Sequence, residues 1–131
     1  MEYQFSATLR GDYLHVKVLG MNNPANVRRW ALEAIEACRW HRCGKLLVEE
    51  YLLGESIADM DTFMIATEGA KAAQGHLTHV AYVNTNPEHS KDTLKFAEYV
   101  VSLNGVNMRL FDNIQDADIW LTGFSVRPSV Q

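Results

Sequence analysis

Residues Lys45 to Ser56, with the sequence KLLVEEYLLGES, form an apolar run that ends abruptly in a glycine-containing loop. The apolar part, centred on Leu46 to Val48, predicts a buried strand. Ser56 then opens a region with helical spacing, so the segment predicts a strand, a loop and a helix in succession. This junction often carries functional residues in α/β proteins, because parallel strands end along one edge of the sheet.

Upstream of this segment, the sequence predicts a β-hairpin followed by a long helix. Residues 3–9 and 13–19 alternate between apolar and polar side chains, and the Arg-Gly-Asp sequence between them predicts a turn. Asn23 can cap a helix whose first turn contains Pro24. One stripe of this helix is apolar and consists of Val27, Trp30, Ala31, Ala34, Ile35 and Cys38. We therefore expect Trp30 to be a core residue and Cys38 to be a buried small hydrophobe.

Downstream, the pattern continues as helix, strand, helix, strand and helix. Ser56 and Asp59 have the spacing of a capping box, which predicts that Ser56 is the N-cap of the second helix. The apolar stripe expected to face the core on this helix consists of Ile57, Met60, Phe63, Met64 and Thr67. Strands are predicted over residues 77–83 and 106–111, and the last helix carries Trp120, a second expected core residue. Strands alternating with helices predict an α/β fold with a mixed, mostly parallel five-stranded sheet and four helices.

The composition is typical of one soluble globular domain. The chain has 131 residues, of which 47% are hydrophobic and 21% are charged, so it can bury a core without disulfides or a metal. We expect a single domain over residues 1–122 and a C-terminal tail over residues 123–131. The net charge of −4 argues against nucleic acid as a partner, because phosphate binding requires a concentrated basic face.

Several motifs of other protein classes are absent from the sequence. No apolar run reaches the roughly 20 residues needed to span a bilayer, and the first ten residues lack the apolar core of a signal peptide. Cys38 and Cys43 do not have the spacing of a zinc or redox motif. Neither a Gly-rich phosphate loop nor a dinucleotide fingerprint is found. We expect a cytoplasmic protein with no cofactor.

The order of elements and two segments resemble the STAS domain family, which includes anti-sigma-factor antagonists and the cytoplasmic domains of sulphate transporters. One segment is the strand KLLVEE ahead of a loop and a helix. The other is the closing sequence VNMRLFDNIQDADIWL, in which the last strand is followed by an acidic turn and an Ala-x-x-Trp-Leu helix. The residues that carry this second similarity are Phe111, Asp112, Ala117, Trp120 and Leu121. The resemblance covers residues 1–122. Within the family, the chain looks more specifically like the divergent, stand-alone bacterial members.

The resemblance implies a STAS-like superhelix of strand–helix turns and a regulatory function. Antagonists of this family bind a partner kinase and are switched by phosphorylation of a serine in an Asp-Ser-Ser-Gly-like motif at the start of the second helix. The corresponding residues here are Gly54, Glu55, Ser56, Ile57 and Ala58, with one serine and no aspartate directly before it. Phosphorylation of Ser56 is therefore a hypothesis beside the simpler one that Ser56 only caps the helix.

A polar set of residues is predicted at the edge where the parallel strands end. Ligands usually bind at this edge, although turns and helix caps need polar residues there as well. The candidate partner-binding or ligand-binding residues are Asn22, Asn23, Tyr51, Glu55, Ser56, Asn84, Asn86 and His89. The resemblance adds that partners of this family dock around the start of the second helix.

Two kinds of chemistry at this edge lack part of the pattern that they require. A nucleophilic serine needs a histidine base, and the elbow pattern Gly-x-Ser-x-Gly would require glycine where Ala58 stands. A cluster of carboxylates could hold Mg²⁺, but Glu49 and Glu50 point to opposite faces of a strand, and acids near a helix start are favourable in themselves. The acidic cluster consists of Glu49, Glu50, Glu55, Asp59 and Asp61. We expect no catalytic residue and no metal site.

The sequence thus favours a regulatory module that acts by protein–protein contact around the start of the second helix, without catalysis. The first alternative is a small-molecule or lipid carrier, which would have a large apolar cavity between the sheet and the helices. The second is a small enzyme that uses the polar edge, and the third is a homodimer assembled through the first strand.

Overall fold

The computed structural model describes residues 3–123, so the tail predicted over 123–131 lies, apart from Gly123, outside the described residues. Within residues 3–123, five strands and four helices follow one another in the predicted order. Their bounds are β1 Tyr3–Arg10, β2 Tyr13–Met21, α1 Pro24–Trp40, β3 Lys45–Leu53, α2 Asp59–Ala73, β4 His79–Asn84, α3 Lys91–Leu103, β5 Asn107–Phe111 and α4 Ile114–Thr122. None of these helices is long and apolar enough to cross a membrane.

The strands form one sheet in which sequence order and spatial order are the same, from β1 to β5. β1 pairs antiparallel with β2, and every later pair is parallel. The predicted mixed, mostly parallel sheet is confirmed. In its centre, the register places Glu50 of β3 between Val18 of β2 and Asn84 of β4.

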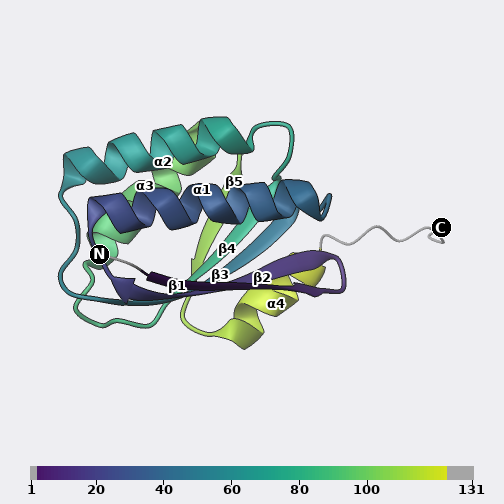
Figure 1. Cartoon of the computed structure of the whole chain (residues 1–131), viewed down its shortest axis with the longest axis horizontal. Coiled ribbons are helices and arrows are strands. Elements are labelled where there is room, and N and C mark those ends of the chain that lie inside the picture. Colours follow the sequence, from purple (N-terminus) through teal and green to yellow (C-terminus); the bar gives the residue numbers. More distant parts are fainter. Residues whose placement is uncertain (1–2, 124–131) are drawn as a thin grey trace.

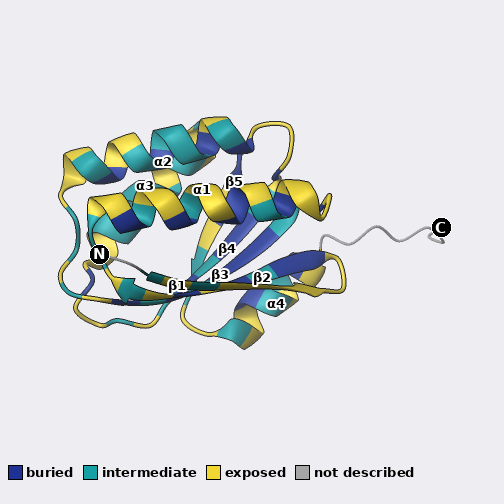
Figure 2. Ribbon diagram, in the orientation of Figure 1, coloured by how far each residue is buried: buried dark blue, intermediate teal, exposed yellow. Residues whose placement is uncertain are grey.

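The helices cover both faces of the sheet (Figure 1). α1, α2 and α3 lie on one face, and α4 lies on the other. α2 packs mainly against α1 and α3, and therefore lies farther from the sheet than α1 does. Buried residues follow this arrangement, since they concentrate on the central strands β2, β3 and β4 and on the inward sides of the helices (Figure 2).

Two apolar clusters result, one on each face of the sheet. The larger cluster lies under α1–α3 and includes Leu46, Val48 and Leu52 from alternate positions of β3. The smaller one lies under α4 and includes Leu47 of the same strand. Because successive side chains of a strand point to opposite faces, β3 contributes to both clusters and is buried on both sides.

The first helix has the predicted start and the predicted buried stripe. Asn23 is its N-cap, and the Asn23 Oδ1 atom accepts a hydrogen bond of 2.9 Å from the backbone N–H of Asn26. Trp30 and Cys38 are buried in the larger cluster, as expected. Trp120 is only half-buried; it packs at the side of the smaller cluster with its ring centroid 5.5 Å from that of Phe111.

The prediction that Ser56 caps the second helix is wrong. α2 begins at Asp59, and its N-cap position is occupied by Ala58, which makes no side-chain capping bond. The Ser56 Oγ atom instead accepts a hydrogen bond of 2.7 Å from the backbone N–H of Ser90, at the start of α3. The capping-box spacing was misleading because the Ser56 hydroxyl has a partner from a different element.

The predicted apolar stripe of α2 is also wrong in its phase. Met60, Phe63 and Met64 are exposed. The buried residues of the helix are smaller and consist of Thr62, Ala66, Ala70 and Ala73. A search for large apolar residues selects the wrong face here, because small residues allow α2 to pack closely across α1 and α3.

Trp30 provides a test of the core. Replacing this buried side chain in Trp30→Ala should lower the free energy of unfolding by about 3–5 kcal/mol, because it removes apolar contacts and leaves a cavity. Trp40, which lies on the same helix and is 82% exposed, provides the matched control. Urea denaturation should show a change below about 0.5 kcal/mol for Trp40→Ala. A loss of similar size for both variants would mean that the packing of α1 is described incorrectly.

Candidate functional site

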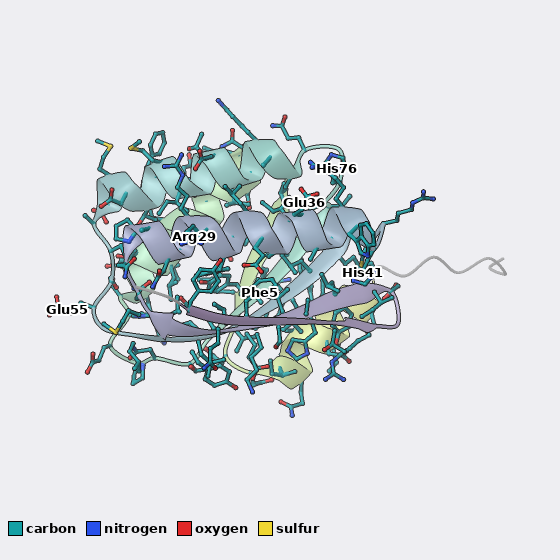
Figure 3. The ribbon with its side chains drawn as sticks, in the orientation of Figure 1. Phe5, Arg29, Glu36, His41, Glu55 and His76 are labelled. Carbon is teal, nitrogen blue, oxygen red and sulfur yellow. The ribbon has the colours of Figure 1, made fainter. Side chains whose placement is uncertain are left out.

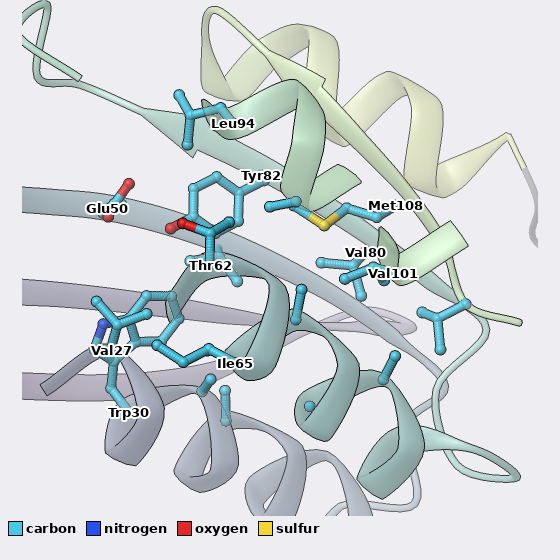
Figure 4. Close-up of a pocket in the computed structure, with 18 of the residues that line it drawn as sticks. Val27, Trp30, Glu50, Thr62, Ile65, Val80, Tyr82, Leu94, Val101 and Met108 are labelled. Carbon is cyan, nitrogen blue, oxygen red and sulfur yellow. The ribbon is translucent and has the colours of Figure 1, made fainter. Parts of the chain in front are cut away.

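A cavity of about 170 Å³ lies between the sheet and the helices α1, α2 and α3 (Figure 4). Its walls are almost entirely apolar and include side chains from all three helices and from β3, β4 and β5. On the α2 side the wall is formed largely by small residues, Ala66, Gly69, Ala70 and Ala73. An engineered apolar cavity of about 150 Å³ in another protein binds benzene, so this space is large enough for a small molecule.

Glu50 is an acidic residue in this largely apolar wall. It lies on the same side of β3 as Leu46, Val48 and Leu52 of the larger cluster, and only 3% of it is exposed. The Tyr82 hydroxyl donates a hydrogen bond to the Glu50 carboxyl, and Figure 4 shows the two groups turned toward each other. The Glu50 Oε1 atom has no hydrogen-bond partner among the described residues.

Burial controls the protonation of this carboxyl group. Removal from water raises the pKa of Glu50 from 4.5 to about 7, and the hydrogen bond from Tyr82 only partly opposes this rise. Burial beside Glu50 also raises the pKa of Tyr82, which therefore stays protonated as a donor. Near neutral pH, Glu50 can thus exist with or without its proton.

His89 is the nearest group that could carry a positive charge, with its Nδ1 atom 4.0 Å from the Glu50 Oε1 atom. It is buried, and its Nδ1 atom donates a hydrogen bond of 2.8 Å to the Asn84 Oδ1 atom. Burial lowers the pKa of His89 below its ordinary value of 6.5. Burial thus favours the neutral form of His89.

The structure brings together most of the predicted site residues. Asn22, Ser56 and His89 line the cavity near the strand ends. Asn84 and Asn86 contact the His89 ring through their side chains.

Three further predicted residues have other positions. The Glu55 carbonyl oxygen accepts a hydrogen bond of 2.7 Å from the Asn22 side chain, while the Glu55 side chain projects outward (Figure 3). Asn23 is occupied in capping α1. Tyr51 lies on the opposite face of the sheet, where its hydroxyl hydrogen-bonds to Glu49. Asn23 and Tyr51 are therefore not part of the cavity site.

Glu50, Tyr82, Trp30 and Thr62 line one cavity, which the sequence did not predict. The available signal was the position of Glu50, which interrupts an apolar face formed by Leu46, Val48 and Leu52. A glutamate at such a position must be buried with the strand. Its hydrogen-bond partner Tyr82 comes from β4, and the lining residues Trp30 and Thr62 come from α1 and α2. Their proximity depends on packing that the local pattern does not specify.

The same geometry bears on the two alternatives of a metal site and a nucleophilic serine. In residues 3–123, no group of three or more His, Cys, Asp or Glu side chains is arranged to hold a metal ion. The Ser56 hydroxyl is bonded to the backbone of Ser90 and not to a histidine. His41 and His76 lie at the end of the molecule opposite Glu55 (Figure 3).

No protein-family model and no curated protein sequence matches the chain. Among solved structures, the chain is similar to the crystal structure of an uncharacterized protein of the DUF3478 family with a SpoIIAA-like fold, from Shewanella loihica PV-4. The TM-score is 0.51 at 14% sequence identity, and the similarity covers 91% of this chain and 93% of that chain. The chain has the SpoIIAA-like fold, which is the fold of STAS domains and anti-sigma-factor antagonists.

The raised pKa of Glu50 predicts a specific dependence of stability on pH. The folded protein holds the proton more tightly than the unfolded chain, so the free energy of unfolding falls as pH rises from about 4.5 to about 7. Glu50→Gln removes this decline. At about pH 8 the variant should be more stable than the wild type by on the order of 3 kcal/mol, and near pH 4.5 the two should be similar.

Urea denaturation of both proteins across this pH range measures the difference. Parallel stability curves for the two proteins would show that Glu50 is hydrated and that its pKa is ordinary.

Proposed function

We propose that this STAS-like protein is a regulatory module that binds a protein partner through an exposed apolar surface on α2. This surface, called here the α2 surface, consists of Met60, Phe63 and Met64. The observation that carries the proposal is their exposure, which reaches 68% for Met60 and 59% for Met64. Contiguous exposed apolar residues on a folded domain are typical of interaction sites.

The spacing of these residues supports a single contact surface. Positions separated by three and four residues lie on the same side of a helix, so the three side chains of the α2 surface are neighbours. Phe63 also stacks on Phe96 of α3, with ring centroids 6.5 Å apart. This contact gives Phe63 a fixed position at the boundary between the two helices. Methionine adds flexible, polarizable side chains that adapt to a partner.

The charges around the α2 surface favour a basic partner. Asp59 and Asp61 flank Met60, and Glu55 precedes the helix. The segment of residues 55–61 contains these three acids and no basic residue. A partner segment with apolar residues and a rim of lysine or arginine would complement this surface, because complementary charges speed association and exclude other partners.

Ser56 is the proposed site of control. Its hydroxyl oxygen accepts a hydrogen bond from the backbone N–H of Ser90 and so joins the loop before α2 to the start of α3. A phosphate on Ser56 would add negative charge beside Glu55 and Asp59 and would alter this connection. Such a modification should weaken binding at the α2 surface.

A double variant tests the α2 surface. Met60→Ser with Met64→Ser removes exposed apolar contacts without changing charge, and should weaken binding at least about tenfold, which corresponds to about 1.4 kcal/mol. The partner is first isolated from an extract of the source cells on immobilised wild-type protein, and is then purified and titrated by calorimetry.

The matched control is Leu103→Ser with Ile119→Ser, which removes two exposed apolar side chains from α3 and α4. Its affinity should stay within about twofold of the wild type. Ser56→Asp should also weaken binding, and Ser56→Ala should not. Equal affinity for the wild type and the Met60 and Met64 double variant would refute the α2 surface, and self-association through β1 in sedimentation would favour the homodimer instead.

A further inference from the structure

We infer that the cavity binds a small amphipathic amine, whose ammonium group pairs with the Glu50 carboxylate and whose apolar part fills the space between the sheet and α2. This site is separate from the α2 surface, and the inference does not depend on the proposed function. It rests on the cavity together with the unpartnered, buried carboxylate oxygen on its wall.

The Glu50 carboxyl has one hydrogen-bonding oxygen without a donor. Buried polar groups are almost always hydrogen-bonded, and buried charges are almost always paired. Only one side of the Glu50 carboxyl is hydrogen-bonded, by the Tyr82 hydroxyl, while the Oε1 atom has no hydrogen-bond partner among the described residues and lies 4.0 Å from the His89 Nδ1 atom. An ammonium group would supply both a donor and a positive charge. The Glu50 side chain is already at the cavity wall, so a ligand in the cavity can reach it.

Two aromatic rings lie in the same cavity wall as Glu50. Trp30 and Tyr82 both line the cavity, with their ring centroids 6.3 Å apart and their planes inclined by 35°. Aromatic faces attract cations, most strongly where water is excluded. A cavity wall that contains a carboxyl group and two aromatic rings therefore suits a cationic head group better than a neutral or anionic one.

The apolar part of the cavity limits the size of the ligand's apolar group. Most of the remaining wall is formed by aliphatic and small side chains, among them Ile65, Leu94, Val101 and Met108. The cavity volume of about 170 Å³ suits one aromatic ring or a short alkyl chain, since about 150 Å³ holds benzene. The ligand class is therefore an arylalkylamine or a short alkylamine.

Charge near the strand ends supports entry of a cation. Asn22, Ser56 and Ile57 line this end of the cavity and are only half-buried, so it lies close to solvent. Glu55 and Asp59 are exposed in the adjoining loop and helix start. A negative rim raises the local concentration of cations and increases their rate of association.

Binding should depend on pH through Glu50. The titratable groups facing it are Tyr82 from β4 and His89 from the loop before α3, whereas the residues that α1, α2 and α3 contribute to the wall are uncharged. An aliphatic amine stays protonated throughout this range. Its affinity should therefore rise as Glu50 loses its proton.

The test uses three probes of matched size: 2-phenylethylamine, the neutral 2-phenylethanol and the anionic phenylacetate. Calorimetric titration of the wild type at about pH 8 should give at least about tenfold tighter binding for the amine than for the alcohol. Amine binding should weaken at least about tenfold at about pH 5.5, where Glu50 is protonated. Glu50→Gln should lose the same factor at about pH 8 while its affinity for the alcohol changes less than about threefold.

Two further variants make the result specific. Glu49→Gln removes the same charge from the opposite face of β3, where Glu49 pairs with His15, and should leave amine binding unchanged. Ala97→Leu adds bulk to the cavity wall and should weaken all three probes. The inference is overturned if the amine binds no more tightly than the alcohol, if Glu50→Gln binds it equally well, if Ala97→Leu has no effect, if no probe binds, or if phenylacetate binds best and tightens on acidification.

Discussion

Strand β3 is covered on both faces, and the rest of the structure depends on this constraint. Leu47 packs under α4, while Leu46, Val48 and Leu52 pack under α1–α3. Glu50 lies on the second of these faces and is only 3% exposed. The carboxyl must therefore be satisfied within the protein, and the Tyr82 hydroxyl does this only in part. The resulting penalty for ionisation accounts for the raised pKa of Glu50.

The composition of α2 links the cavity to the exposed surface above it. This helix turns Ala66, Ala70 and Ala73 inward and packs across α1 and α3. Short side chains do not fill the distance to the sheet, so an apolar space remains beneath the helix. Met60, Phe63 and Met64 of the same helix are exposed and form the α2 surface. One helix thus bounds the proposed ligand site on its inner side and carries the proposed partner site on its outer side.

Local patterns in the sequence predicted the fold well. The alternation of apolar and polar residues identified the hairpin, and the Asn23 cap with the apolar stripe around Trp30 identified α1. Each of these signals is carried by residues that are close together in the sequence. The prediction of the buried face of α2 failed because that face consists mostly of alanine, and the prediction relied on large hydrophobic residues. The prediction that Ser56 caps α2 failed because the hydrogen-bond partner of Ser56, the backbone N–H of Ser90, is distant in sequence. The cavity site combines Glu50 with residues of other elements, so only the three-dimensional packing reveals it.

The most direct test of the central claim is the ionisation of Glu50 itself. The ¹³C chemical shift of its side-chain carboxyl carbon can be followed by NMR across the pH range, with Glu50→Gln used to assign the signal. A buried carboxyl without a cationic partner predicts a midpoint near 7, which moves to lower pH when 2-phenylethylamine is added. A midpoint near the ordinary value of 4.5 in the free protein would contradict the claim, because it would show that Glu50 is hydrated or already paired.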